Sequence, residues 1–263
     1  MSKTPSSGLK KLVAANAPLW GAEAEVCRTY FRSSTRNAHS DCAWIARQCY
    51  KELVDGALFR MLEMQGEYPL EVLGPGGVPV DEGTRTELAH FLAYAEAFRV
   101  AGDPDQPRLD LATILAADWP ENGELMALRR EHCRQSPDLG RRAHAFTEGG
   151  YCTLYSTGME LAQEHNGDPG LVDRAIAVAS KVVYDDEWEH MLEGIADLDD
   201  DNMSDRDWAR LCELTSQQSR LRIRMRNAQF GFPVSRQRMA ELEAGHAEPI
   251  VFDWERAGMA APG

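Results

Sequence analysis

Apolar residues recur every three or four positions along four long stretches of the chain. This is the period of an α-helix that buries one face. Asp41 is a suitable N-cap for the first stretch, and the Asn166-Gly167 pair ends the third. No stretch shows the alternation of a half-buried strand, so the pattern predicts an all-α protein built on a four-helix bundle. The expected long helices span residues 41–64, 82–101, 137–165 and 168–198.

Shorter amphipathic segments precede and connect these helices. Residues 9–15 and 22–31 each predict a short helix behind a frayed N-terminal tail. The connection over residues 109–134 predicts two helical pieces, broken at Trp119-Pro120. This connection joins the two halves of the predicted bundle.

The last part of the chain predicts a fifth helix over residues 205–229 and a shorter one over 235–244. Late in the fifth helix, arginines recur at every second position. We expect them to form a solvated face that complements the helix dipole, with an acidic partner as the alternative. These arginines are Arg220, Arg222, Arg224 and Arg226. The expected organisation is an N-terminal extension (1–40), a metal-binding bundle (41–198) and a C-terminal helical extension packed on it (199–263).

Composition indicates a soluble globular protein and argues against two classes of function. The chain has 263 residues, 43% of them apolar and 27% charged, enough to bury a core without cross-links. The formal net charge of −14 argues against nucleic-acid binding, which needs a basic surface. No apolar stretch approaches the roughly 18 residues that span a membrane. The six cysteines form no Cys-x-x-Cys pair and follow no secretion signal, so we expect reduced thiols in the cytoplasm.

Two short motifs carry candidate metal chemistry. In Glu87-Leu-Ala-His90 and Glu187-Trp-Glu-His190, a carboxylate and an imidazole stand three residues apart, on one face of a helix. Each motif follows a lone glutamate on the preceding long helix. One Glu and one Glu-x-x-His pair from each half of a four-helix bundle is the ligand pattern of two metal ions. The first ligand set is Glu52, Glu87 and His90, and the second ligand set is Glu148, Glu187 and His190.

The predicted ligands, which are also the predicted catalytic residues, match two ferrous ions in charge and chemistry. Four carboxylates balance four positive charges, which keeps a buried centre near neutral. Carboxylate together with imidazole favours iron, or manganese at one position, and the lack of thiolate disfavours structural zinc. The alternative is that these groups are surface charges on ordinary helices. Against it, each lies on the apolar stripe of its helix, where an unpaired carboxylate is costly.

In these segments the chain resembles the ferritin-like di-iron carboxylate superfamily, and its oxygenase and oxidase branch more than the storage ferritins. The resemblance covers about residues 41–196. It implies that the lone glutamates are terminal ligands, that the motif glutamates bridge the ions, and that each histidine binds one iron. Asp186, directly before Glu187, matches the aspartate that in these branches hydrogen-bonds the ligand histidine of the other motif. Thr86 departs from this pattern on the other side.

Other side chains are placed near the predicted site. Tyr94, Cys152, Tyr155 and Tyr184 either hydrogen-bond a ligand or carry an electron, or they are plain core. His144, one turn before the lone glutamate of the second ligand set, is a candidate extra ligand. The other histidines are expected at the surface: His39, His132, His165 and His246.

Glycines near the predicted ligands indicate a special backbone. Gly149 and Gly150 stand in the middle of a predicted helix, where each costs about 1 kcal/mol relative to Ala. They predict either a kink or π-bulge that leaves room for oxygen or substrate, or close helix packing. Gly56 and Gly194 lie four residues after a predicted ligand and are placed to enlarge the cavity.

The resemblance implies a di-iron enzyme that uses O2 to oxidise a small organic substrate, with an electron donor and a homodimer as further expectations. The resemblance does not select the substrate. One alternative is ferroxidase activity with iron storage, which the long extensions disfavour because they would crowd a protein shell. The other is a metal-free helical interaction protein, which leaves the ligand pattern unexplained. No nucleic acid or membrane is expected as a partner.

Overall fold

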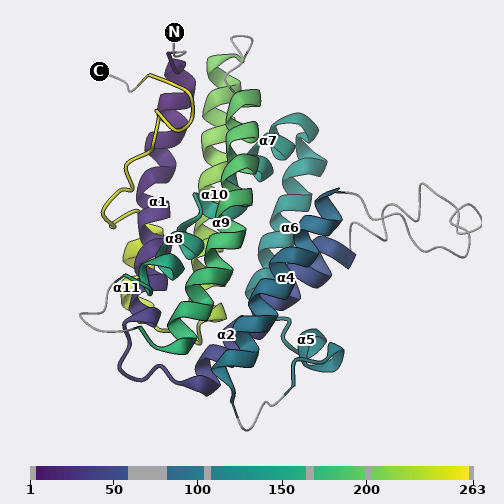
Figure 1. Cartoon of the computed structure of the whole chain (residues 1–263). Coiled ribbons are helices and arrows are strands. Elements are labelled where there is room, and N and C mark those ends of the chain that lie inside the picture. The colour runs from purple at the N-terminus through teal and green to yellow at the C-terminus, as the bar shows by residue number, and fades with distance from the viewer. Residues whose placement is uncertain (1–3, 59–81, 104–107, 164–168, 199–202, 261–263) are drawn as a thin grey trace, which may run out of the picture. The chain divides into compact units, whose positions relative to one another are not determined.

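A computed structural model describes residues 4–58, 82–103, 108–163, 169–198 and 203–260 (Figure 1). Within these ranges the chain is helical and contains no β-strand, which confirms the all-α prediction. Every helix in the described ranges is too short or too polar to cross a membrane. The chain divides into two compact units, and both take residues from the predicted bundle. Unit 1 comprises Met1–Ser33, Pro120–Thr157 and Tyr184–Gly263, and unit 2 comprises Ser34–Trp119 and Gly158–Val183.

Unit 2 is built around two neighbouring helices, α2 (Ala38–Tyr50) and α4 (Glu82–Ala101), the second with the predicted bounds. A π-helix, η1 (Lys51–Leu58), continues α2 and packs against α4, and α5 (Leu111–Ala116) packs against α2. The first part of α9 (Leu171–Leu198) also belongs to this unit. The buried stripes of α2 and α4 follow the predicted period and include Ile45, Cys49, His90, Tyr94 and Phe98.

Helix α2 begins before Asp41, its predicted N-cap. The cap is Asn37, whose side chain accepts a hydrogen bond from the backbone N–H of Ser40, while the Ser40 hydroxyl accepts one from the Asn37 N–H. This reciprocal arrangement satisfies two backbone donors at once. Asp41 lies in the first turn and instead accepts a hydrogen bond from Arg36 Nε at 2.8 Å.

Unit 1 is organised around a long pair of helices, α1 (Ser7–Phe31) and α10 (Asp205–Gln229), which lie side by side (Figure 1). α6 (Pro120–Gln135) and α7 (Pro137–Thr147) pack against each other and against α10. The short α11 (Arg236–Glu243) contacts α1 and α10. The predicted fifth helix, the short helix after it and the break before Pro120 are confirmed.

The two short N-terminal helices that the sequence predicts are one continuous helix, α1. It begins at the Ser6 N-cap and runs through Pro18 without ending. Its apolar positions face the rest of unit 1, with Leu9, Leu12 and Trp20 almost fully buried. Packing of this long apolar face outweighs the local penalty of an internal proline.

The helix predicted over residues 137–165 is broken in the middle. α7 ends at Thr147, and Glu148–Gly150 forms a short 3-10 turn. Gly150, Tyr151 and Cys152 then take left-handed backbone angles, with φ of 56°, 54° and 54°. α8 (Thr153–Glu160) restarts the helix. Left-handed residues cannot continue an α-helix, so this run of three ends it.

Candidate metal centre

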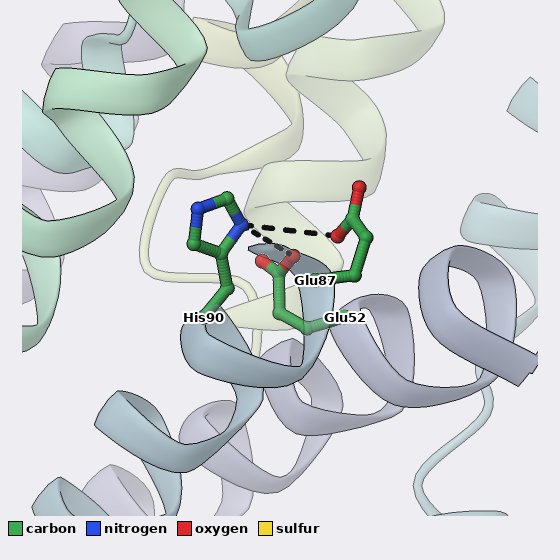
Figure 2. A group of neighbouring side chains, drawn as sticks. All are labelled: Glu52, Glu87 and His90. Atoms are coloured by element: carbon green, nitrogen blue, oxygen red, sulfur yellow. Dashed lines mark ion pairs between the residues drawn. The ribbon is translucent and has the colours of Figure 1, made fainter. Parts of the chain in front are cut away.

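The first ligand set comes together in unit 2 (Figure 2). One possible ligand atom from each residue lies within 4.8 Å of the other two. His90 Nδ1 is 3.7 Å from Glu52 Oε2 and 3.8 Å from Glu87 Oε2. The Glu52 and His90 side chains are only 5% and 2% exposed, and that of Glu87 is 15% exposed. Among the described residues, this is the one group of at least three acidic, His or Cys side chains with such spacing.

Helix geometry explains how these three side chains meet. Glu87 and His90 stand one turn apart on α4 and so share a face. Glu52 projects from the π-helix η1, which packs against α4. π-helical segments are rare and concentrate at functional sites. The sequence offered a π-bulge at Gly149 and Gly150 as one possibility. The structure has a 3-10 turn there, and its π-helix is the segment Lys51–Leu58 that carries Glu52.

The electrostatic interactions among Glu52, Glu87 and His90 favour a positive charge at this position. Burial alone would raise the pKa of Glu52, but contact with His90 and neighbouring groups lowers it to about 2. Burial raises the pKa of Glu87, with the charge of Glu52 acting in the same direction. Burial would lower the pKa of His90, yet the two carboxylates raise it to about 10. Without metal, a proton on His90 compensates the carboxylates.

The donor set fits one divalent transition metal ion. Two carboxylates and one imidazole suit iron or manganese, and three protein ligands leave coordination positions open. The Gln48 side-chain amide donates a hydrogen bond to Glu52 Oε1 from one turn earlier. Such outer contacts orient a ligand before metal arrives. Glu52, Glu87 and His90 are thus the residues that would hold an ion here.

Gly56 leaves room for the Glu87 carboxylate. A Cβ atom at position 56 would lie 2.7 Å from Glu87 Oε2 and 2.8 Å from its Cδ. We expect Gly56→Ala to displace this carboxylate and to weaken metal binding by roughly 10- to 100-fold. Isothermal titration with Co²⁺ measures the change. Gly123→Ala is the matched control and should leave the affinity unchanged, since nothing lies within 4 Å of the Cβ atom that the substitution adds.

The second ligand set lies only partly within the described residues. Glu148 is the C-cap of α7, with extended backbone angles, and is half-buried. Glu187 lies on α9 in unit 1 and is also half-buried, as is its neighbour Asp186. The side chain of His190 lies outside the described part of the structure. The second metal position therefore stays a prediction.

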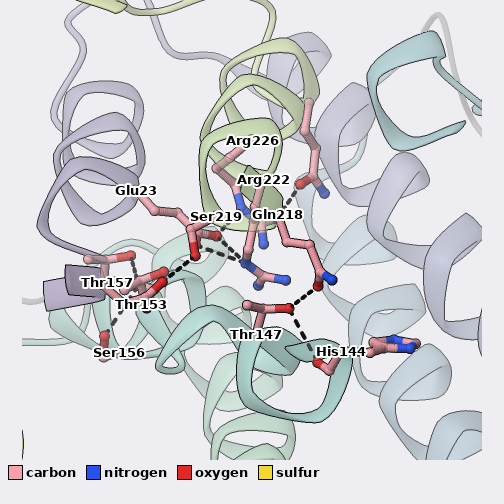
Figure 3. Close-up of polar contacts among 12 residues, drawn as sticks. Glu23, His144, Thr147, Thr153, Ser156, Thr157, Gln218, Ser219, Arg222 and Arg226 are labelled. Atoms are coloured by element: carbon pink, nitrogen blue, oxygen red, sulfur yellow. Dashed lines mark hydrogen bonds and ion pairs between the residues drawn. The ribbon is translucent and has the colours of Figure 1, made fainter. Parts of the chain in front are cut away.

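Near this segment, unit 1 buries an ion-pair cluster (Figure 3). Glu23 on α1 accepts hydrogen bonds from Arg222 Nε at 2.9 Å and from Arg226 Nε at 3.0 Å, both on α10. All three residues are at most 3% exposed. Burial would raise the pKa of Glu23, but the two guanidiniums outweigh it and lower the pKa. The prediction of a solvated basic face is wrong for these two arginines, whereas Arg220 and Arg224 are exposed.

Arg129 on α6 is a further buried cation, which the sequence analysis missed. It is 8% exposed, and its Nη2 donates to the carbonyl and hydroxyl oxygens of Thr147 at 3.3 and 3.4 Å. Burial and the charge of Arg222 lower its pKa to about 10, although Glu148 and Glu187 act to raise it. The sequence signal was its spacing, since it lies four residues after the buried Leu125 on the inner face of α6.

The close-packing interpretation of the two glycines is supported at Gly150. A Cβ atom there would lie 2.1 Å from Arg222 Nε and 2.5 Å from Glu23 Oε2. Glycine allows this approach and also the left-handed backbone. The backbone two residues after Glu148 therefore packs tightly against the buried ion pair.

The tyrosines and the cysteine predicted near the site have varied surroundings. Tyr94, one turn after His90, is buried with its hydroxyl 3.4 Å from the Ser180 hydroxyl. Cys152 and Tyr155 are buried in unit 1, and burial raises the pKa of the Cys152 thiol. The Tyr184 hydroxyl accepts a hydrogen bond from Arg256 Nη1 at 2.7 Å.

The histidines outside the ligand sets differ in their burial. His144 is half-buried, and burial together with Arg129 lowers its pKa to about 4, so it is neutral at pH 7. His132 was expected at the surface but is buried. Its ring nitrogens pair with Gln217 and Gln218, each at 3.0 Å, so its polar atoms are satisfied there. His39 and His246 are exposed as predicted, and His165 lies outside the described residues.

Comparisons of the chain with protein-family models, with curated proteins and with solved structures give no significant match.

Proposed function

We propose that the chain is a di-iron oxidoreductase, an oxidase or oxygenase that uses O2 to oxidise a small organic substrate, on a ferritin-like four-helix bundle. One observation carries this proposal: two carboxylates and an imidazole from separate elements converge in a buried position of unit 2. Such a group is costly to bury without a cation. A bound metal ion supplies the redox chemistry that protein side chains lack.

The residues of this group would bind and prepare the ion. Glu52 and Glu87 supply negative charge in a position with little access to water. Gln48 orients Glu52, and His90 gives up its proton when it becomes a ligand. The second ligand set would hold the second ion, and Asp186 would orient a ligand histidine. We further expect manganese as an alternative at one position.

Metal content tests the proposal directly. After anaerobic loading with ferrous iron and desalting, elemental analysis of the wild-type protein should find at least one iron ion per chain. Glu87→Ala should retain less than about a tenth of it, because one ligand and half of the negative charge are lost. Glu82→Ala is the matched control, an exposed glutamate on the same helix, and should load like wild type.

Oxygen consumption by the loaded protein then tests the redox part. We expect O2 uptake by wild type and by Glu82→Ala, and none above background by Glu87→Ala. Equal iron in all three proteins would contradict the metal centre. Stoichiometric iron without O2 uptake would retain the centre and contradict the oxidase assignment. Elution as a large multi-subunit shell on size exclusion would favour iron storage instead.

A further inference from the structure

The C-terminal strap, residues 248–260, follows α11 and lies beside α1 (Figure 1). The Ile250 N–H donates a hydrogen bond to a backbone carbonyl of α1 at 3.1 Å. The Tyr151 hydroxyl accepts one from the Asp253 N–H at 2.8 Å and donates one to the Val251 carbonyl oxygen at 3.4 Å. The strap is therefore bound to unit 1 through its backbone, as a docked peptide segment is.

Phe252 is the first side-chain anchor of the strap. It is only 5% exposed, and its ring centroid lies 6.2 Å from that of Trp20 and 5.4 Å from that of Tyr151. The residue before it, Val251, is 88% exposed. The strap thus turns one side chain out to solvent and the next into an aromatic cluster. Buried aromatic anchors of this kind carry much of the affinity of an interface.

Arg256, four positions later, is the second anchor. Its guanidinium carbon lies 4.1 Å from the centroid of the Trp188 ring and 5.1 Å from that of the Tyr184 ring. Its Nη1 also donates a hydrogen bond to the Tyr184 hydroxyl at 2.7 Å. Indole is the aromatic ring that attracts a cation most strongly, and a planar guanidinium stacks well on such rings. The Tyr184–Trp188 pair on α9 is therefore suited to receive an arginine.

The face that receives the strap offers more than the strap uses. Where the strap begins, a Cβ atom at Gly21 would lie 1.9 Å from the Glu248 carbonyl oxygen, so the two backbones meet directly. Beside this crossing, residues of α1 and strap residues 248–250 line a cavity of about 420 Å³, the size of a small ligand site. Trp20 Nε1 and Trp188 Nε1 are buried and have no hydrogen-bond acceptor among the described residues. The strap therefore leaves space and hydrogen-bond donors on this face unused.

We propose that this strap-binding face of unit 1 is a peptide-docking site, which the strap occupies as an internal competitor. The face comprises Trp20 and Gly21 of α1, Tyr151, and Tyr184 and Trp188 of α9. Its partner is a segment of another protein that has an aromatic residue followed four positions later by an arginine, the two anchors of the strap. The net charge of −14 favours such a basic segment. The inference does not depend on the proposed metal centre.

Fluorescence anisotropy with a labelled synthetic peptide of residues 247–260 tests the proposal on the full chain. In the double variant Phe252→Ala/Arg256→Ala the strap loses both anchors, so the face opens and the peptide should bind. Wild type should bind the peptide at least roughly tenfold more weakly, because its tethered strap competes at about millimolar effective concentration. Arg256→Ala alone removes an exposed side chain and should shift binding in the same direction. Val251→Ala, at an exposed position of the strap, is the matched control and should bind like wild type.

Three results would overturn the inference. The first is a double variant, folded as judged by far-UV circular dichroism, that binds the peptide no better than wild type. If the double variant does not fold, the same result in Arg256→Ala overturns it. The second is equal binding of a peptide with alanine at both anchor positions, which would show that the anchors are not recognised. The third is a wild-type dimer that the double variant loses, since the occupant would then be the strap of a second copy.

Discussion

Glu23→Ala is expected to lower the free energy of unfolding by about 3–5 kcal/mol, the cost of leaving buried charges without their partner. Glu23 is 2% exposed and is shared by Arg222 and Arg226, so its removal leaves two guanidiniums uncompensated inside unit 1. Urea denaturation followed by circular dichroism measures the change. A loss below about 1 kcal/mol would show that water or neighbouring groups solvate the arginines.

The matched control is Glu25→Ala, two residues along the same helix. Glu25 also pairs with an arginine, since Arg238 donates to both of its carboxylate oxygens at 2.7 and 2.8 Å. Both side chains are 37% exposed. A surface pair of this kind contributes about 0–1 kcal/mol. The contrast between the two variants therefore measures the effect of burial on one type of ion pair.

The Glu23 contribution should also depend on pH in a defined direction. The pKa of Glu23 in the folded protein lies below its ordinary value of 4.5. Its stabilisation is therefore fully present above about pH 4.5 and is lost as the pH falls through the folded pKa. The stability difference between wild type and Glu23→Gln should be constant from pH 7 to 5 and should shrink below that.

Gly150→Ala is expected to destabilise unit 1 by about 2–5 kcal/mol, the sum of left-handed strain and overpacking. The φ angle of Gly150 is 56°, and an added Cβ would lie 2.1 Å from Arg222 Nε. Gly231→Ala separates the two causes. The φ angle of Gly231 is 71°, but nothing lies within 4 Å of the Cβ atom that the substitution adds. The Gly231→Ala variant should therefore lose only about 1–2 kcal/mol through backbone strain. Equal losses in both variants would contradict the close approach at Gly150.

The first ligand set was predictable because local rules determine its parts. Helical spacing places Glu87 and His90 on one face, and the apolar stripe of α2 continues to Glu52. The π-helix that presents Glu52 was not predictable, because nothing in its composition distinguishes it from an α-helix. The sequence still identified the ligand group, because Glu52 stays on the buried face although its segment is a π-helix and not an α-helix.

The buried arginines show where reading one helix at a time fails. Arg222 and Arg226 belong to a run of α10 in which arginines alternate with apolar residues, and each alone resembles an exposed cation. Their burial depends on Glu23, which lies about 200 residues away on α1. The available signal was joint: a carboxylate on one apolar stripe and two arginines, one turn apart, on another. Ion pairs between distant segments have no local spacing rule, so only the tertiary structure identifies them.

The pairing of α1 with α10 has a consequence for how the chain folds. Glu23 and Arg222 are separated by 199 positions, so α1 leaves the ribosome long before its partner exists. Until α10 is complete, the Glu23 carboxylate lacks both of its arginines and the apolar face of α1 lacks its long helical partner. The α2–α4 pair of unit 2, by contrast, is complete after about residue 101. Contacts of such long sequence separation form slowly, and apolar surface exposed meanwhile favours aggregation. We therefore expect the apolar face of α1 to stay exposed during synthesis for longer than that of α2, and to be the more prone of the two to aggregate.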